Sequence, residues 1–134
     1  MILLDTSFVS RVFRRSVPSA GDPAVAAYHR MIEEDVSLFL PGIVAQEVLS
    51  GLRPENEFVR MARILEGFAL VLAEKSDHLR AAQVFNICAR KGISTSAVDC
   101  LIAALAIRLS APLATFDEDF SRIAHHTELM IHRI

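Results

Sequence analysis

Short apolar runs that alternate with longer helical patterns are the feature of this chain that most constrains its fold. Such runs, bounded by turn-forming residues, are typical of buried strands, and helices between them supply the crossovers that parallel strands require. We expect strands at 1–4, 36–40, 68–72 and 112–115, and the sheet gains a fifth strand if 129–132 also pairs. The chain is therefore predicted to adopt a doubly wound, three-layer α/β fold. In this fold about seven helices flank a parallel sheet of four to five strands.

Helical patterns fill the intervals between these runs. The clearest covers 97–109, where apolar side chains recur at the spacing of one helix face. Ser76 is expected to cap the helix that starts there, and the stretch 16–23, with its Pro, Ser and Gly residues, is expected to form a loop. The helices are predicted at 6–15, 24–34, 43–52, 55–66, 76–90, 97–109 and 118–125.

Length and composition indicate one folded domain that covers 1–134. Hydrophobic residues make up 52% of the 134 residues, which excludes intrinsic disorder. The longest apolar run, at 100–107, is much shorter than the ~20 residues of a membrane-spanning helix. The N-terminal residues have no basic stretch of the kind found in export signals. We therefore expect a cytoplasmic protein with no membrane contact.

The net charge of −2 does not by itself indicate a nucleic-acid partner. Twelve of the fourteen cationic residues are arginine, however, and arginine is the side chain best shaped to bind phosphate. Arg11, Arg14 and Arg15 form a local basic patch, for which an ordinary solvated helix face is an equally good explanation. The two cysteines have no metal-ligand spacing and are expected in the core.

Four acidic residues occupy positions that favour a shared site. Asp5 directly follows the first predicted strand and Asp117 the fourth, and ligands of open parallel sheets bind beyond the carboxyl ends of the strands. Glu47 and Asp99 interrupt helices that are otherwise apolar. Each acid alone has a structural explanation, as a helix cap, as part of a capping box or as a solvent-facing side chain. These explanations do not require all four acids to gather at one end of the sheet.

Convergence of these carboxylates would demand a cation. Two unit charges ~4 Å apart repel by about 1 kcal/mol in water and by about 4 kcal/mol at an effective dielectric constant near 20. A cluster of oxygen ligands without cysteine or histidine selects Mg²⁺ or Mn²⁺ over zinc. A carboxylate-bound ion of this kind is the usual apparatus for hydrolysis of a phosphodiester.

The segments that carry the four acids resemble the motifs of PIN domains. They appear in the family's order, at spacings of about 40, 50 and 20 residues, across essentially the whole chain. The motifs are Leu4-Asp5-Thr6-Ser7, Gln46-Glu47-Val48-Leu49-Ser50-Gly51-Leu52, Asp99-Cys100-Leu101-Ile102-Ala103-Ala104 and Thr115-Phe116-Asp117-Glu118-Asp119-Phe120.

The resemblance implies a metal-dependent endoribonuclease that uses Mg²⁺, with Mn²⁺ as a substitute. Stand-alone PIN domains of this size are mostly VapC-type toxins of type II toxin–antitoxin systems. Such toxins cleave structured RNA, either tRNA or rRNA, and thereby inhibit translation and growth. A homodimer and neutralisation by a VapB-type antitoxin are implied as well. From the residues themselves, we expect a partner surface at an apolar patch formed by Phe8, Val12, Phe13 and Tyr28.

By position in these motifs, the resemblance implies that Asp5 and Asp99 are the principal metal ligands. Glu47 would complete the site, or support its ligands without binding the metal directly, and help to orient the attacking water. Asp117 would hold a water ligand of the metal or a second ion.

Neighbouring side chains are implied to have accessory roles. The hydroxyl groups of Thr6, Ser7 and Thr115 would position the carboxylates by hydrogen bonds. Asp119 competes with Asp117 for the fourth acidic position, and Asp117 is preferred because it lies nearer the end of the strand.

Two alternatives remain on the sequence alone. The first is a PIN-like scaffold that binds a partner without catalysis, although an intact set of four acids argues against it. The second is a phosphoacceptor receiver domain, which is also a doubly wound fold with an acidic Mg²⁺ pocket. That domain requires an acidic pair after the first strand and a lysine after the fifth, and the two lysines here, Lys75 and Lys91, are at neither position.

Overall fold

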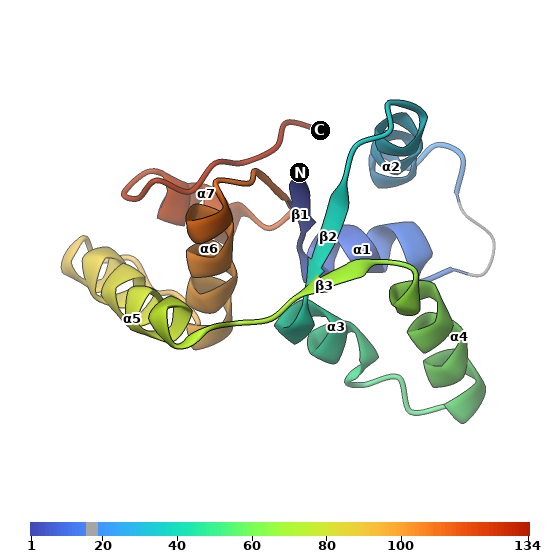
Figure 1. Ribbon diagram of the computed structural model, residues 1–134, viewed down its shortest axis with the longest axis horizontal. Helices are drawn as coiled ribbons and strands as arrows, with labels where there is room; N and C mark the ends of the chain where they lie inside the picture. The colour runs from blue at the N-terminus through green and yellow to red at the C-terminus, as the bar shows by residue number, and fades with distance from the viewer. Residues whose placement is uncertain (16–18) are drawn as a thin grey trace.

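Four parallel strands form one sheet in the order β3-β2-β1-β4 (Figure 1). The computed structural model describes residues 1–15 and 19–134, so the expected loop residues 16–18 lie outside the described residues. This sheet confirms the predicted α/β class with its parallel strands. The strands are β1 (Ile2–Leu4), β2 (Leu38–Pro41), β3 (Ala69–Val71) and β4 (Leu113–Ala114).

The expected fifth strand is reduced to a single parallel bridge between Leu113 and Ile131. The backbone N–H of Leu113 donates to the carbonyl of Met130, and the carbonyl of Leu113 accepts from the N–H of His132, both at 2.9 Å. The C-terminal segment therefore extends the sheet beyond β4 by one residue pair.

The helices lie in two layers, with α1, α2 and α4 on one side of the sheet and α5, α6 and α7 on the other (Figure 1). Helix α3 follows β2 directly and contacts both α1 and α6. Among the helices that the structure describes, none is both long and apolar enough to cross a membrane. The helices are α1 (Thr6–Phe13), α2 (Pro23–Glu33), α3 (Gly42–Leu49), α4 (Glu55–Glu66), α5 (Lys75–Arg90), α6 (Ala97–Leu109) and α7 (Glu118–Ala124).

Strand β1 runs through the centre of the hydrophobic core. All three of its residues are buried, because it has a strand on each side and a helical layer on each face. Phe8 from α1 and Ile102 from α6 are fully buried in the same core, one from each layer. Consecutive apolar residues without alternation are the pattern that a doubly covered central strand requires.

Strand β3, at the edge of the sheet, is more exposed than predicted, because it was expected to be a buried strand. Ala69 and Leu70 are exposed and Val71 is half-buried. The cause is topological, because β3 pairs with β2 on one side and with no strand of the described chain on the other.

The prediction of an exposed apolar patch for partner binding on the first helices is also wrong. Phe8 and Val12 are buried in the core, and α2 packs against α1. Phe13 and Tyr28 are half-buried and contact each other edge to face, with ring centroids 5.1 Å apart. These side chains therefore hold α1 and α2 together.

Strand order predicts that a ligand would bind beside the end of β1. The chain steps from β1 to β2 and β3 on one side of the sheet, whereas β4 pairs with β1 on the other side. Ligands of open α/β sheets bind at the carboxyl ends of the strands where the order reverses in this way. The N–H of Asp5 donates to the carbonyl of Ala114 at 3.0 Å, so the ends of β1 and β4 lie side by side.

An ion pair between buried Asp77 and the more exposed Arg108 joins α5 to α6, and the N-terminus of α5 differs from the prediction that Ser76 caps it. The cap is Glu74, which forms a capping box with Asp77. Asp77 is only 1% exposed and accepts a hydrogen bond from Nε of Arg108 on α6 at 2.8 Å. Burial acts to raise the pKa of Asp77, but the bonds from Arg108 and from the Glu74 backbone lower it more, so that the net pKa is below its usual range.

Removing the buried carboxylate of this ion pair is expected to cost more stability than removing an exposed one. Asp77→Ala deprives Arg108 of its buried partner and α5 of its capping box, so the free energy of unfolding should fall by about 2–3 kcal/mol. Glu128→Ala removes the exposed partner of Arg80 and should cost about 0–1 kcal/mol. Urea unfolding measures both changes, and equal losses would contradict the role given to Asp77.

Candidate metal centre

The carboxylate of Asp5 is held in one orientation by hydroxyl groups. Asp5 is 3% exposed and is the N-cap of α1. Its Oδ2 accepts hydrogen bonds from Ser7 Oγ and Thr115 Oγ1, both at 2.7 Å, and from the Ser7 backbone N–H at 3.3 Å. Every hydrogen bond found for this carboxylate within 1–15 and 19–134 ends on Oδ2. The other oxygen, Oδ1, is therefore the one available to a cation.

The same two hydroxyl groups position the loop that follows β4. Ser7 Oγ accepts from the backbone N–H of Phe116 at 2.9 Å, and Thr115 Oγ1 accepts from the N–H of Asp117 at 3.0 Å. The two hydroxyl oxygens are 3.2 Å apart. This network connects Asp5 with Asp117 across the adjacent ends of β1 and β4.

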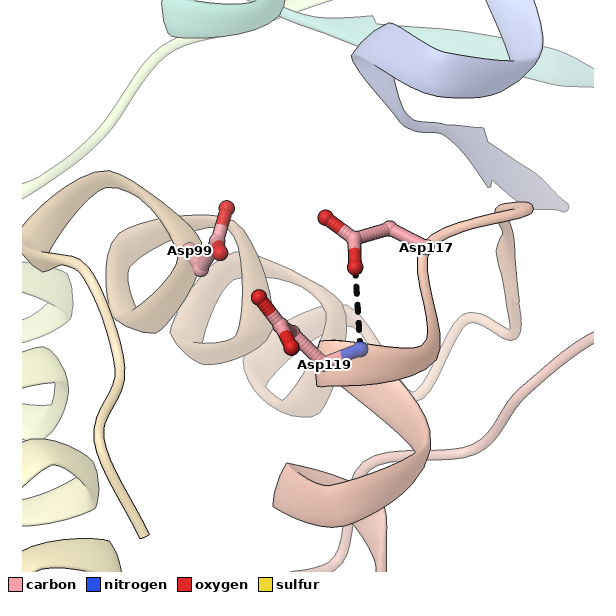
Figure 2. A group of neighbouring side chains, drawn as sticks. All are labelled: Asp99, Asp117 and Asp119. Carbon is pink, nitrogen blue, oxygen red and sulfur yellow. Dashed lines mark hydrogen bonds between the residues drawn. The ribbon is translucent and has the colours of Figure 1, made fainter.

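Asp99, Asp117 and Asp119 bring their carboxylates together (Figure 2). One oxygen of each lies within 4.8 Å of the others, and all three residues are half-buried. Asp117 is the N-cap of α7, and its Oδ1 accepts from the N–H of Asp119 at 2.9 Å. Figure 2 shows the side chains of Asp117 and Asp119 turned toward Asp99, which projects from the first turn of α6.

Glu47 reaches the same region from α3. Its Oε1 accepts a hydrogen bond of 2.7 Å from Thr6 Oγ1, the hydroxyl of the residue that follows Asp5. Glu47 is half-buried, so it does not simply point into solvent from the helix edge. The bond with Thr6 joins the third helix to the first turn of α1.

The group of three close carboxylates contains Asp99 and Asp117 but not Asp5 or Glu47, whose charges nevertheless act on Asp99. The pKa of Asp99 is raised from 3.8 to about 6. Burial is the largest cause, and the negative charges of Asp117, Asp5 and Glu47 raise it further, against an opposing hydrogen bond with Ser96. Like charges that disfavour ionisation in this way lie close enough to interact through a medium of low polarity.

Capping and clustering occur together at these acids. Asp5 and Asp117 are helix N-caps, as the structural explanation predicts, and the charges of both also act on Asp99. At α6 the cap is Ser96, whose Oγ accepts from the N–H of Asp99 at 3.0 Å. Asp119 does not cap α7, and its carboxylate pairs with Arg122 one turn later in the helix.

The donor set fits a hard divalent cation. Within the described residues, the acids close enough to share an ion are Asp99, Asp117 and Asp119, and all three offer carboxylate oxygens. Nearby, the hydroxyl of Thr115 holds the carboxylate of Asp5 by a hydrogen bond. Oxygen ligands suit hard cations, and a positive ion at this edge would offset the repulsion that raises the pKa of Asp99.

One neighbour of this centre was missed by sequence analysis. The guanidinium carbon of Arg11 lies 4.0 Å from the ring centroid of Phe116, the residue between Thr115 and Asp117. Nothing in the sequence pairs a residue of the first helix with a loop near the C-terminus, so this contact required the three-dimensional structure.

Comparison with known proteins identifies the family and the fold. A sequence model of the family described as "PIN domain" matches residues 2–126. The chain is 33% identical over 132 residues to Ribonuclease VapC11 of Mycobacterium tuberculosis, with 96% of each chain covered. Its structure is similar to that of FitAcB from Neisseria gonorrhoeae, with a TM-score of 0.78 and 26% identity over 99% of this chain and 97% of the other. VapBC2 from Rickettsia felis, bound to a promoter DNA fragment, has a TM-score of 0.77 at 19% identity, with 98% of both chains covered. The chain belongs to the PIN-domain family, as its four motifs predicted.

Proposed function

We propose that this chain is a metal-dependent endoribonuclease toxin of the VapC type. The observation that carries the proposal is the gathering of acids from distant segments. Asp99, Asp117 and Asp119 have carboxylate oxygens within 4.8 Å of one another. The hydroxyl of Thr115 bonds both to Asp5 and to the backbone of Asp117. Repulsion within such a cluster lowers the stability of a scaffold that only binds a partner, whereas a nuclease needs the cluster to hold a cation. The relative named Ribonuclease VapC11 supports RNA as the substrate.

The metal proposed is Mg²⁺, with Mn²⁺ as a substitute, because the ligands are oxygen atoms. PIN-domain nucleases are generally dependent on a divalent metal. Asp5, through Oδ1, and Asp99 are the principal ligands, and Asp117 completes the set or helps to hold a second ion. Glu47 orients the attacking water. When bound, the ion acidifies water and stabilises the negative charge that develops on the phosphate.

The surrounding polar side chains are proposed to act as positioning residues. Ser7 and Thr115 fix the rotamer of Asp5, and Thr6 fixes that of Glu47. Asp119 is an accessory acid, since part of its charge is already offset by Arg122. A site held by such supporting bonds needs little rearrangement when substrate arrives.

The biological setting proposed follows from the family. The substrate is structured RNA, either tRNA or rRNA, whose cleavage inhibits translation and growth in the cytoplasm. A VapB-type antitoxin is the proposed regulatory partner of a homodimeric toxin, in line with the VapC relative. Membership of the PIN family argues against the receiver-domain alternative. A catalytically inert PIN-like binding module is the alternative that the following experiments separate.

Loss of one ligand charge is expected to abolish RNA cleavage without unfolding the protein. Asp5→Asn and Asp99→Asn should each reduce the cleavage rate by more than the ~100-fold that loss of a ligand's supporting partner costs. Asp35→Asn is the matched control, because Asp35 is exposed with a φ of 53°, a conformation that asparagine tolerates well. Cleavage of bulk tRNA and rRNA, together with the heat of Mn²⁺ binding, measures the effect. Retained cleavage in either site variant would refute the assignment.

Asp117 is expected to matter more than Asp119. Asp117→Asn keeps the cap of α7, since asparagine caps as well as aspartate does, but removes a charge beside Asp99. Asp119→Asn removes a charge that Arg122 already offsets. The first variant should therefore lose about 10-fold more activity than the second, in the range seen for altered metal-site partners. Equal losses in the same cleavage assay would make Asp119 a full ligand.

Asp99→Asn is expected to stabilise the metal-free protein at neutral pH. Because the pKa of Asp99 is raised from 3.8 to about 6 in the folded state, ionisation lowers the free energy of unfolding progressively across that interval. Asparagine does not ionise, so the variant should gain stability relative to the parent at about pH 7 and not at about pH 4. Urea unfolding in EDTA at both pH values measures this difference. A free energy of unfolding lower than the parent's at both pH values would instead identify Asp99 as a structural residue.

A further inference from the structure

Three arginines lie on α1 and just beyond its C-terminal end, and the N-terminus of the same helix is capped by Asp5. Arg11 lies six residues after Asp5, about 9 Å along the helix axis at 1.5 Å per residue. Arg14 and Arg15 follow at the end of the same helix, and all three side chains are exposed. One helix therefore joins the proposed metal ligand to a basic surface.

This basic surface borders a hollow rather than a flat helix face. The hollow has a volume of about 410 Å³ between the end of α1 and the start of α2. Its polar rim includes Ser10, Ser19 and Asp22 besides the arginines. A concave surface of this kind can contact a ligand from several sides. The residues that supply its positive charge are Arg11, Arg14 and Arg15.

Arg11 is fixed in place but keeps donors for a ligand. Its Nη2 donates to Oδ1 of Asp22 at 3.0 Å, and its guanidinium lies over the ring of Phe116. Guanidinium carries five N–H donors, and 42% of this side chain remains exposed. Stacking on Phe116 therefore sets the orientation of the Arg11 guanidinium group beside the loop that carries Asp117.

The end of the helix is also anchored by an arginine. Nη2 of Arg60, from α4, donates to the carbonyls of Phe13 and Arg14 at 2.9 and 3.2 Å. These carbonyls carry the partial negative charge of a helix C-terminus, so Arg60 stabilises the helix end itself. Arg60 thus has a structural role, which leaves the exposed arginines 11, 14 and 15 as the ligand-facing set.

We propose that Arg11, Arg14 and Arg15 bind the phosphodiester backbone of the RNA substrate beside the cleavage centre, with Arg11 nearest to the acids. This inference rests on the proposed ribonuclease activity. A cluster of carboxylates repels RNA, and a chain with a net charge of −2 offers no general attraction, so cations must act locally. Arginine forks match phosphate oxygens, and contacts to the backbone position a nucleic acid without reading its sequence.

The test is RNA binding by the full chain in EDTA, where cleavage cannot occur. Bulk tRNA is the probe, titrated against the parent, Arg14→Ala/Arg15→Ala and the triple variant that adds Arg11→Ala. Arg90→Ala is the control, because Arg90 is an exposed arginine at the end of α5 in the opposite helical layer. Each variant is first checked by its melting temperature. The double variant keeps the Arg11–Asp22 bridge if the triple variant proves unstable.

The triple variant should bind tRNA at least about 10-fold more weakly near physiological salt. Its slope of log affinity against log salt concentration should be smaller by about 2, the change expected for three lost phosphate contacts on a single strand. The double variant should show a smaller change in the same direction, and Arg90→Ala none. Folded variants that bind tRNA with the parent's affinity and slope would overturn the proposal.

Three further readouts test this inference separately from the proposed function. Parent protein that binds tRNA through these arginines but never cleaves it with Mg²⁺ or Mn²⁺ would refute the ribonuclease and leave the RNA contact standing. Normal Mn²⁺ heat in the triple variant is expected, because none of the arginines is a ligand. Unchanged tRNA binding with lost affinity for poly-glutamate would assign the surface to an acidic protein segment and overturn the inference.

Discussion

Repulsion between carboxylates at the shared end of β1 and β4 is the constraint to which the rest of the structure responds. The pKa of Asp99 is raised to about 6, by burial first and then by the charges of Asp117, Asp5 and Glu47. Groups that repel one another stay together only if other bonds fix them. Hydroxyl donors, above all Thr115, hold the carboxylates at defined positions. The folded protein therefore keeps the repulsion between them, and a bound cation would relieve it.

The strand order explains why distant segments contribute to this one place. Because β1 lies between β2 and β4, the first residue after β1 faces the loop after β4, and α3 starts at the carboxyl end of β2 beside them. Helix α6 packs against α5 and is fastened to it by the ion pair of Arg108 with Asp77. This packing helps to fix the position of α6, and with it the position of Asp99 in the first turn of that helix.

The sequence was sufficient to predict the strand-end positions of Asp5 and Asp117, and the family motifs predicted the hydroxyl partners Ser7 and Thr115, but contacts between helices were not predicted. Asp5 and Asp117 follow apolar strands in the sequence, so a rule about strand ends predicts where they lie. The ion pair of Asp77 with Arg108 joins residues from two helices, and the capping box that it completes displaced the expected cap at Ser76. The partner of Asp77 and the cap of α5 depend on tertiary packing, which the periodicity of the sequence does not predict. The exposure of β3 likewise depends on which strand ends at the edge of the sheet.

Capping and metal binding are compatible on one side chain because a carboxylate has two oxygens. Asp5 commits Oδ2 and Asp117 commits Oδ1 to the fold, and each has a second oxygen for other partners. The N-termini of these helices also act electrostatically on the carboxylates. Asp5, Asp99 and Asp117 lie at the N-termini of α1, α6 and α7, where each helix presents a partial positive charge of roughly half a unit. Three helix dipoles aimed at one cluster offset part of the repulsion before any cation arrives. Burial and the remaining repulsion together raise the pKa of Asp99, and a divalent ion would counter both by stabilising its ionised form.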